Sequence, residues 1–319
     1  MRVVLNYRRP NERLEYALGE LGHDWVYHLW DIRNIEAQGA DAVLFEFKQI
    51  VKEELRFAAL SLRLRKCGIP TATWCLDNPN IGSRMWKLHA IAKYRLVDVL
   101  ATHSLQGLEG YGNVLYLPNA AMTQHYNLGV HTLEEMRDPG FCTVDVSFIG
   151  NFDGERYPEH RERMRLLGAL EGILRKLGRS CRFVGGDSMD YGAQTDLIRR
   201  SRINLNVGCA ADRYDRRSWG LPERCYGIPA CGGFLLSDDR EHAKDDFAIG
   251  EEIDLFRELP DCVEKIRHYL DAHEESRRIA ENAYARVHRE HTYRHRVARL
   301  LGALMRATDG YSGGRGKTS

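Results

Sequence analysis

The sequence predicts an α/β protein with two Rossmann-like domains, each built on a parallel sheet, that face a central cleft. The chain has 319 residues, which suits two domains of about 150 residues each. Short apolar runs alternate with stretches of helical period. This alternation occurs twice, on either side of a polar, turn-rich interval at residues 126–141. Repeated strand–helix alternation is typical of parallel sheets covered by helices.

The first series predicts a domain over residues 1–125. Asn11 stands where a helix N-cap belongs, directly before a stretch of helical period. Pro70 follows Gly68 and Ile69, a common transition from helix to strand. We expect strands at residues 3–5, 25–29, 42–47, 71–76, 97–101 and 114–117, and helices at 12–21, 52–66 and 84–94.

The second series predicts a domain over residues 126–290. Residues 307–319 are rich in small and polar side chains, and we expect them to form a disordered tail. We expect strands at 144–149, 181–184, 203–207 and 233–236, and helices at 160–177, at 194–200, after residue 223, and from 261 to about 305.

Composition limits the classes of function. The net charge is +1, so no overall charge attracts nucleic acid or an anionic membrane, and no run approaches the roughly 18 apolar residues of a membrane span. The eight cysteines are scattered without a Cys-x-x-Cys pair, which is typical of thiols in a reducing cytoplasm. Cys225 and Cys231 are six residues apart, a spacing that suits neither a zinc knuckle nor a redox pair. We expect a cytoplasmic protein without a metal site there.

Polar and small residues follow the predicted strands, at the edge where parallel sheets bind ligands. Donors and glycines outnumber carboxylates among them, which favours a polar ligand approached closely by backbone. In the first domain these residues are Asn6, Arg8, Arg9, Glu46, Lys48, Asp77, Asn78, Thr102, His103 and Asn119; in the second they are Gly150, Asn151, Gly185, Gly186, Asp187, Asn206, Gly208 and Ser237.

Four segments carry a resemblance to a known family. They read "VSFIGNF" (146–152), "SRINLNVG" (201–208), "ERCYGIPACGGFLL" (223–236) and "RRIAENAYARVHREHTYRHRVARLL" (277–301). In this order they resemble the spore-maturation, CgeB-like family of group 1 glycosyltransferases. The resemblance covers about residues 115–301, and "PTATWCLDNP" (70–79) resembles a first-domain strand of the same family.

The resemblance implies a GT-B architecture, with an acceptor domain first and a nucleotide-sugar domain second. Residues 291–306 would then form a helix that crosses back to the first domain. The implied activity moves a sugar from a nucleoside diphosphate sugar, with a UDP-sugar expected, to a hydroxyl acceptor, generally with retention. No Asp-x-Asp metal motif occurs in the chain, so we expect neither a metal nor another cofactor.

Arg224 is the expected cation at the donor. A departing diphosphate develops negative charge, and a guanidinium can hold it with two hydrogen bonds; the alternative is a surface arginine at a helix start. The family pattern has Arg-x-Phe-Glu here, whereas this chain has Arg224-Cys225-Tyr226-Gly227, so the glutamate expected to bind ribose is missing. The expected donor-binding residues are Gly150, Asn151, Asn206, Arg224, Tyr226, Gly227, Gly232 and Gly233.

On the acceptor side we expect Arg8, Arg9, Asn78 and Asn119 to bind, and Asp77 and His103 to act in catalysis. A carboxylate or imidazole at a strand end can orient or deprotonate a hydroxyl. The alternatives are a turn formed by Asp77 before Pro79 and a core or capping role for His103.

Two other functions remain open at this point. One is a nucleotide-sugar epimerase of the same architecture, and the other is a relative that binds sugar nucleotides without turnover. The acceptor is not identified by the sequence. A nucleic-acid acceptor is possible, but the near-neutral charge does not favour it.

Overall fold

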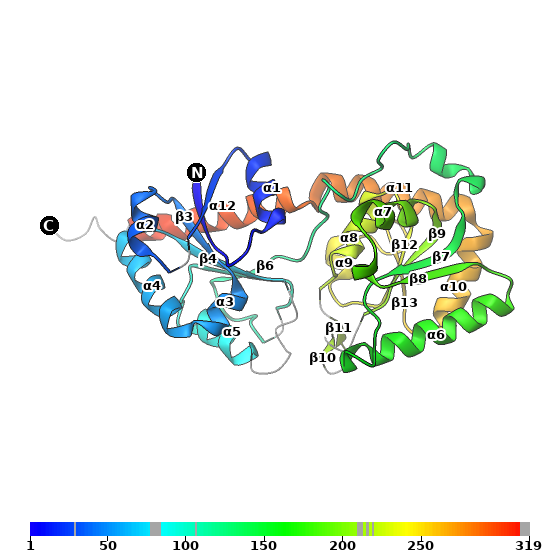
Figure 1. Ribbon diagram of the computed structural model, residues 1–319, viewed down its shortest axis with the longest axis horizontal. Helices are drawn as coiled ribbons and strands as arrows, with labels where there is room; N and C mark the ends of the chain where they lie inside the picture. The colour runs from blue at the N-terminus through cyan, green and yellow to red at the C-terminus, as the bar shows by residue number, and fades with distance from the viewer. Residues whose placement is uncertain are drawn as a thin grey trace. The chain divides into compact units, whose positions relative to one another are not determined.

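The structure is a computed structural model that describes residues 1–28, 30–76, 84–105, 107–208, 213–214, 217–218 and 220–312. The chain divides into two compact units (Figure 1). Unit 1 comprises Met1–Pro118 and Tyr293–Ser319, and unit 2 comprises Asn119–Thr292. The boundaries between the units lie after residues 118 and 292, whereas the sequence predicts boundaries after residues 125 and 290.

Among the described residues of unit 1, six strands form a parallel sheet in the order β2-β1-β3-β4-β5-β6. Asn11 caps the first helix, because its Oδ1 accepts a hydrogen bond of 3.2 Å from the Leu14 N–H. The strands are β1 (Arg2–Asn6), β2 (Asp24–Tyr27), β3 (Ala42–Phe45), β4 (Thr71–Cys75), β5 (Val99–Thr102) and β6 (Val114–Tyr116). The helices are α1 (Glu12–Glu20), α2 (Ile32–Ala37), α3 (Phe47–Lys52), α4 (Glu54–Cys67), α5 (Arg84–Lys93) and α12 (Tyr293–Ser312).

The sheet of unit 1 is buried on both faces. Val4 and Phe45 pack in one apolar cluster with Phe57 of α4. Side chains alternate along a strand, so Val3 and Leu5, both fully buried, point to the other face. There α1 and α12 lie side by side (Figure 1). The near-continuous apolar strands of the sequence reflect this burial on two faces.

Unit 2 contains a second parallel sheet, whose described strands have the order β13-β12-β9-β7-β8. The strands are β7 (Val144–Ile149), β8 (Cys181–Val184), β9 (Ser201–Asn206), β12 (Leu235–Asp238) and β13 (Asp254–Phe256), and an antiparallel pair is formed by β10 (Arg213–Tyr214) and β11 (Arg217–Ser218). The helices are α6 (Arg161–Lys176), α7 (Tyr191–Arg199), α8 (Arg224–Ala230), α9 (Ala243–Asp246), α10 (Leu259–Asp271) and α11 (His273–Glu290), with 3-10 turns at Glu135–Arg137, Pro139–Phe141, Pro158–His160 and Gly186–Ser188. Both parallel α/β domains predicted from the sequence are confirmed.

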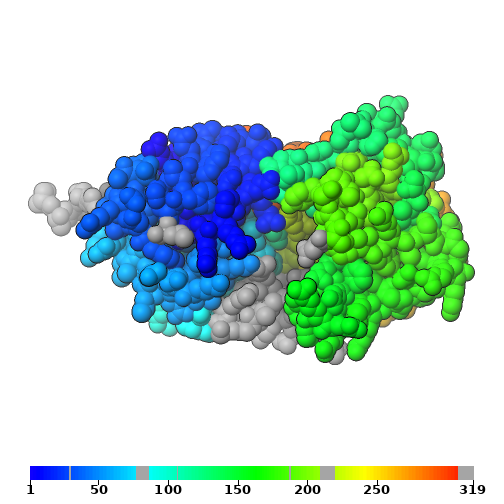
Figure 2. Space-filling view, viewed as in Figure 1, coloured from blue at the N-terminus to red at the C-terminus, as the bar shows by residue number. Residues whose placement is uncertain are grey.

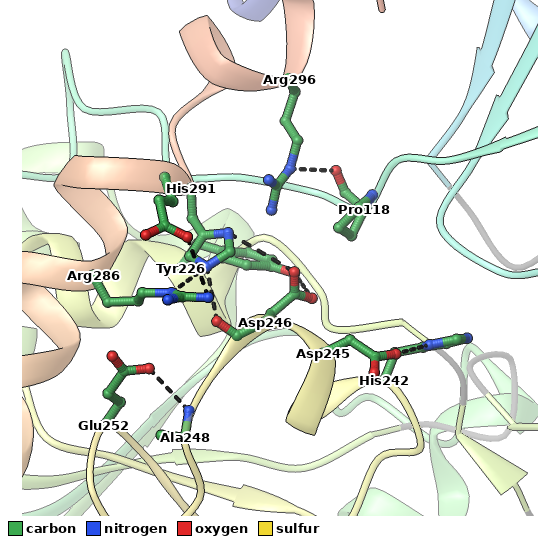
Figure 3. Close-up of polar contacts among 11 residues, drawn as sticks. Pro118, Tyr226, His242, Asp245, Asp246, Ala248, Glu252, Arg286, His291 and Arg296 are labelled. Atoms are coloured by element: carbon green, nitrogen blue, oxygen red, sulfur yellow. Dashed lines mark hydrogen bonds and ion pairs between the residues drawn. The ribbon is translucent and has the colours of Figure 1, made fainter. Parts of the chain in front are cut away.

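The chain passes between the units twice. Within unit 2 the two passing segments pair, since the Ala121 N–H donates to the His291 carbonyl at 2.9 Å. Within unit 1, Arg296 Nε donates to the Pro118 carbonyl at 3.3 Å (Figure 3). Helix α12 continues to Ser312, past the expected start of the tail at residue 307, and residues 313–319 lie outside the described part of the chain. No helix in the described ranges has the length and apolar character needed to cross a membrane.

Candidate active site

The strand ends of unit 2 bring several predicted donor-binding residues together. Strand β7 ends at Ile149 and leads directly into Gly150 and Asn151. Strand β8 leads into Gly185 and Gly186, and a Cβ placed on Gly186 would lie 3.7 Å from the Gly150 Cα. The two loops are therefore neighbours, and a side chain at Gly186 would be in van der Waals contact with Gly150.

Arg224 reaches this strand end from the first position of α8. Its Nη1 donates a hydrogen bond of 2.9 Å to the Ile149 carbonyl, and its Cζ lies 5.3 Å from the centre of the Phe148 ring. A Cβ on Gly150 would overlap the Arg224 guanidinium. Gly150 therefore leaves the space that this guanidinium occupies.

Arg163, which no sequence pattern indicates, is a second cation beside this loop. It projects from α6, is 3% exposed, and its Nη1 donates to the Asn151 carbonyl at 2.5 Å. Its Cζ lies 5.7 Å from the centre of the Phe148 ring, so both guanidinium groups contact the same ring. Asn151 itself forms a turn, because its Oδ1 accepts from the Asp153 N–H at 3.0 Å.

A cavity of about 110 Å³ adjoins Arg224. One side is built by a hydrogen-bonded pair: Tyr126 Oη donates to Gln194 Oε1 at 3.2 Å, and Gln194 Nε2 donates to the Gly186 carbonyl at 3.1 Å. Polar side chains of β7, β9 and α7 thus line the cavity together with the Tyr126 ring and the Arg224 guanidinium. The lining includes Tyr126, Ser147, Gly186, Gln194, Asn204 and Arg224.

Tyr126 also accounts for the glycine at position 227. A Cβ on Gly227 would lie 3.0 Å from the Tyr126 ring, closer than ordinary van der Waals contact. The ring therefore occupies the space that a side chain at 227 would need. Tyr126 is held in turn by Tyr191, whose ring meets it edge-on at 5.8 Å. In the sequence Tyr126 stands only at the start of the polar interval between the domains, where no pattern indicates a role for it.

Asn206 belongs to a buried polar cluster at the end of β9. Its Nδ2 donates to Ser237 Oγ and to Asp238 Oδ1, each at 2.9 Å. Arg240 pairs with Asp238 at 3.2 Å, and the Gly208 N–H donates to the other Asp238 oxygen at 3.0 Å. All these groups are buried, so their hydrogen bonds fix the position of Gly208, two residues after the end of β9.

Tyr226 points into a different network, drawn in Figure 3. The side chain is fully buried, and its hydroxyl donates to Asp246 Oδ2 at 2.8 Å. His291 contacts the same residue at its backbone, with its Nε2 2.8 Å from the Asp246 carbonyl oxygen. The Tyr226 hydroxyl therefore anchors α8 to α9. Beside it, burial raises the pKa of Cys225 to about 12, so this thiol stays protonated at neutral pH.

Gly232 and Gly233 lie at the opposite end of α8 from Arg224. The helix ends at Ala230, directly after Pro229, which is typical of a proline late in a short helix. Gly232 has φ +72°, which turns the chain back, and a Cβ on Gly233 would lie 2.8 Å from Asn204 Nδ2. These glycines provide the turn and close packing, and the structure does not bring them to Arg224.

Two of the predicted acceptor-side residues, Asp77 and Asn78, lie outside the described residues. His103 follows β5 and is 7% exposed. Its backbone N–H donates to the Cys75 carbonyl at 3.3 Å, which places His103 beside the end of β4.

The remaining acceptor-side residues fall in different units. Arg8 and Arg9 follow β1 in unit 1 and are exposed, and the Arg8 N–H donates to Glu46 Oε2 at 3.1 Å. Asn119 is the first residue of unit 2, where its Nδ2 donates to the Leu221 carbonyl at 3.4 Å.

Comparisons with known proteins bear on both units. A family model described as glycosyl transferase-like matches residues 131–302. No curated protein matches the chain. Among solved structures, HepE of Anabaena in complex with UDP and glucose is 11% identical with a TM-score of 0.61, covering 95% of this chain and 100% of HepE. A sucrose-phosphate synthase from Thermosynechococcus elongatus is 10% identical with a TM-score of 0.61, covering 96% and 100%. These similarities show the GT-B fold expected from the sequence.

Proposed function

The chain belongs to the glycosyl transferase-like family, and on that premise we propose that it transfers a sugar from a nucleoside diphosphate sugar to a hydroxyl acceptor. The observation that carries this proposal is the Arg224 guanidinium at the end of β7, 2.9 Å from the Ile149 carbonyl and beside the cavity. When the diphosphate departs, negative charge develops on its oxygens. A fixed guanidinium stabilises that charge.

In this reaction the acceptor oxygen forms a bond to the anomeric carbon as the bond from that carbon to the diphosphate oxygen breaks. The hydroxyl proton passes to the departing diphosphate, so no dedicated protein base is required. We propose that the sugar is transferred with retention, as the resemblance to group 1 glycosyltransferases implies. We also propose that the chain belongs to the spore-maturation, CgeB-like subgroup. Four sequence segments that resemble this subgroup, in the order in which they follow one another along the chain, support this proposal.

We propose a UDP-sugar as the donor. HepE, which shares the fold, has been solved with UDP and with UDP-glucose. In this chain Gly227 offers no carboxylate for the ribose, and the hydrogen-bonded pair of Tyr126 and Gln194 stands next to it. We assign the ribose hydroxyl groups to this pair.

We further propose that the reaction needs no metal, because Arg224 can supply the positive charge that a metal would otherwise provide at the diphosphate. The cytoplasm is the proposed location. The described cysteines are all thiols without a disulfide, which agrees with a reducing compartment.

The test is incubation of the full chain with a panel of UDP-sugars, with and without hydroxyl compounds. Released UDP, the anomeric configuration of the product by NMR, and the recovered donor are measured. A glycoside, or sugar released to water, supports the proposal, and Arg224→Ala should lower both. An epimerised donor would identify an epimerase, and binding without conversion would identify a non-catalytic relative.

A further inference from the structure

Unit 1 contains a cavity of about 250 Å³ that the donor site does not use. It lies where β1, β3 and β4 end, which is the edge at which parallel α/β sheets bind ligands. The first residues of the chain, dark blue in Figure 2, lie on the face of unit 1 shown there. The lining includes Tyr7, Arg9, Arg13, Glu46, Lys48 and Trp74.

Positive charge predominates among the described lining residues. Arg9 and Lys48 are exposed and Arg13 is half-buried, and these three cations face a single carboxylate, that of Glu46. One Glu46 oxygen already accepts a hydrogen bond of 3.1 Å from the Arg8 N–H. The described lining is therefore suited to a ligand with negative charge.

The floor of the cavity is rigid and aromatic. Trp74 is 6% exposed, and its Nε1 donates to the Leu117 carbonyl at 2.9 Å. Its ring lies 5.9 Å from that of Tyr293, over which the Arg13 guanidinium lies at 5.7 Å. Burial, with the charge of Glu46 as a smaller cause, raises the pKa of Tyr7 well above its usual range, so its hydroxyl remains a hydrogen-bond donor at neutral pH.

We propose that this cavity binds the acceptor, and that the acceptor carries an anionic group, a phosphate or a carboxylate, in addition to the hydroxyl that receives the sugar. The proposal rests on the proposed function, because it identifies the second substrate of that reaction. Arg9, Arg13 and Lys48 hold the anion. The aromatic floor contacts the apolar part of the molecule.

A neutral acceptor would not use the three cations. A charge-assisted hydrogen bond from one such cation changes affinity by about tenfold or more. Arg9 and Lys48 are exposed to solvent, so salt screens their part of the attraction. The preference for an anion should therefore be largest at low ionic strength and should decrease as salt is added.

The test compares three compounds with the same sugar ring: glucose, glucose 6-phosphate and glucuronate. Each is titrated into the full chain by calorimetry at low salt, with saturating UDP present so that the diphosphate site is occupied. We expect at least one of the two anions to bind about tenfold or more tightly than glucose. Phosphate and carboxylate are distinguished by which of the two anions shows the gain.

Variants locate the effect. Arg9→Ala and Lys48→Ala should each weaken binding of that anion by about tenfold, and Glu46→Gln should strengthen it. Arg63→Ala and Lys66→Ala remove exposed cations of α4 that do not line the cavity, so they are matched controls expected to leave the affinity unchanged. UDP affinity should stay constant in all five variants.

Two results would overturn the proposal. Either glucose binds as tightly as both anions while UDP binds normally, or the anion affinity is the same in Arg9→Ala and Lys48→Ala as in the controls. A wild-type protein that does not bind UDP would contradict the proposed function instead. In that event the same three titrations, repeated without UDP, decide whether the cavity binds anions.

Discussion

Substitution of Gly150 by alanine should remove Arg224 from the end of β7 without altering Arg224 itself. The added Cβ would overlap the guanidinium and would also lie 3.0 Å from Phe148 Cζ. The arginine side chain is the flexible partner, so it moves and loses its 2.9 Å hydrogen bond to the Ile149 carbonyl. The strand end then lacks its fixed cation.

The magnitude follows from the interaction that is lost. Hydrogen bonds to charged groups contribute about 1.5–3 kcal/mol, which is about 10- to 150-fold in a dissociation constant. Arg224 is half-buried, so salt moves the effect toward the lower value. Gly150→Ala and Arg224→Ala should each weaken UDP binding by an amount in this range. Because both remove the same contact, the double variant should be no worse than Arg224→Ala alone.

The assay is calorimetric titration of UDP into the wild type, the two single variants and the double variant. Gly172→Ala is the matched control, since a Cβ at that position would meet no described atom within 4 Å apart from its chain neighbours and the nearby backbone of its own helix. Wild-type UDP affinity in Gly150→Ala would refute the argument. So would losses that add in the double variant, because independent effects mean that the alanine does not act through Arg224.

Three further predictions concern the same unit. Turnover should survive EDTA, and loss of activity that manganese restores would contradict a metal-free mechanism. Burial raises the pKa values of Cys225 and Cys231 to about 12, so neither thiol should react with iodoacetamide in the folded protein at pH 8, and a mass spectrum showing rapid alkylation of either would be contrary evidence. Because the same thiols ionise near pH 8.5 in the unfolded chain, the free energy of unfolding should fall as pH rises above that value. Tyr226→Phe should destabilise the fold in urea by about 1–3 kcal/mol, because the buried Asp246 loses a donor, and an equal loss of UDP affinity would instead place this hydroxyl at the ligand.

The alternation of strands and helices was predictable because it depends on local pattern. Asn11, for example, caps α1 as its position before an amphipathic stretch indicates. Ends of elements were less predictable. The apolar run that predicts a strand over residues 42–47 extends past β3, which ends at Phe45, and Phe47 begins α3. The one-turn helix α9 and the short strand β13 give too few residues for a period to be recognised.

The site was predictable only in part. Arg224 and Gly150 stand at strand and helix ends that the pattern identifies, and the structure brings them into contact. Arg163 could not be selected, since α6 begins with several arginines and burial alone distinguishes this one. Tyr126 could not be identified from the sequence either, because its partner Gly227 is 101 positions away and the two residues meet only in the folded unit.

The return of the chain to unit 1 determines the order in which the protein can be completed on the ribosome. Unit 2 is one continuous stretch, Asn119–Thr292, whereas unit 1 needs residues from both ends of the chain. Until Tyr293 and the rest of α12 emerge, the buried side chains Leu14 and Leu18 of α1 lack the helix that lies beside them. The half that is translated first is therefore finished last, and in the interval its uncovered apolar surface is what a chaperone would meet.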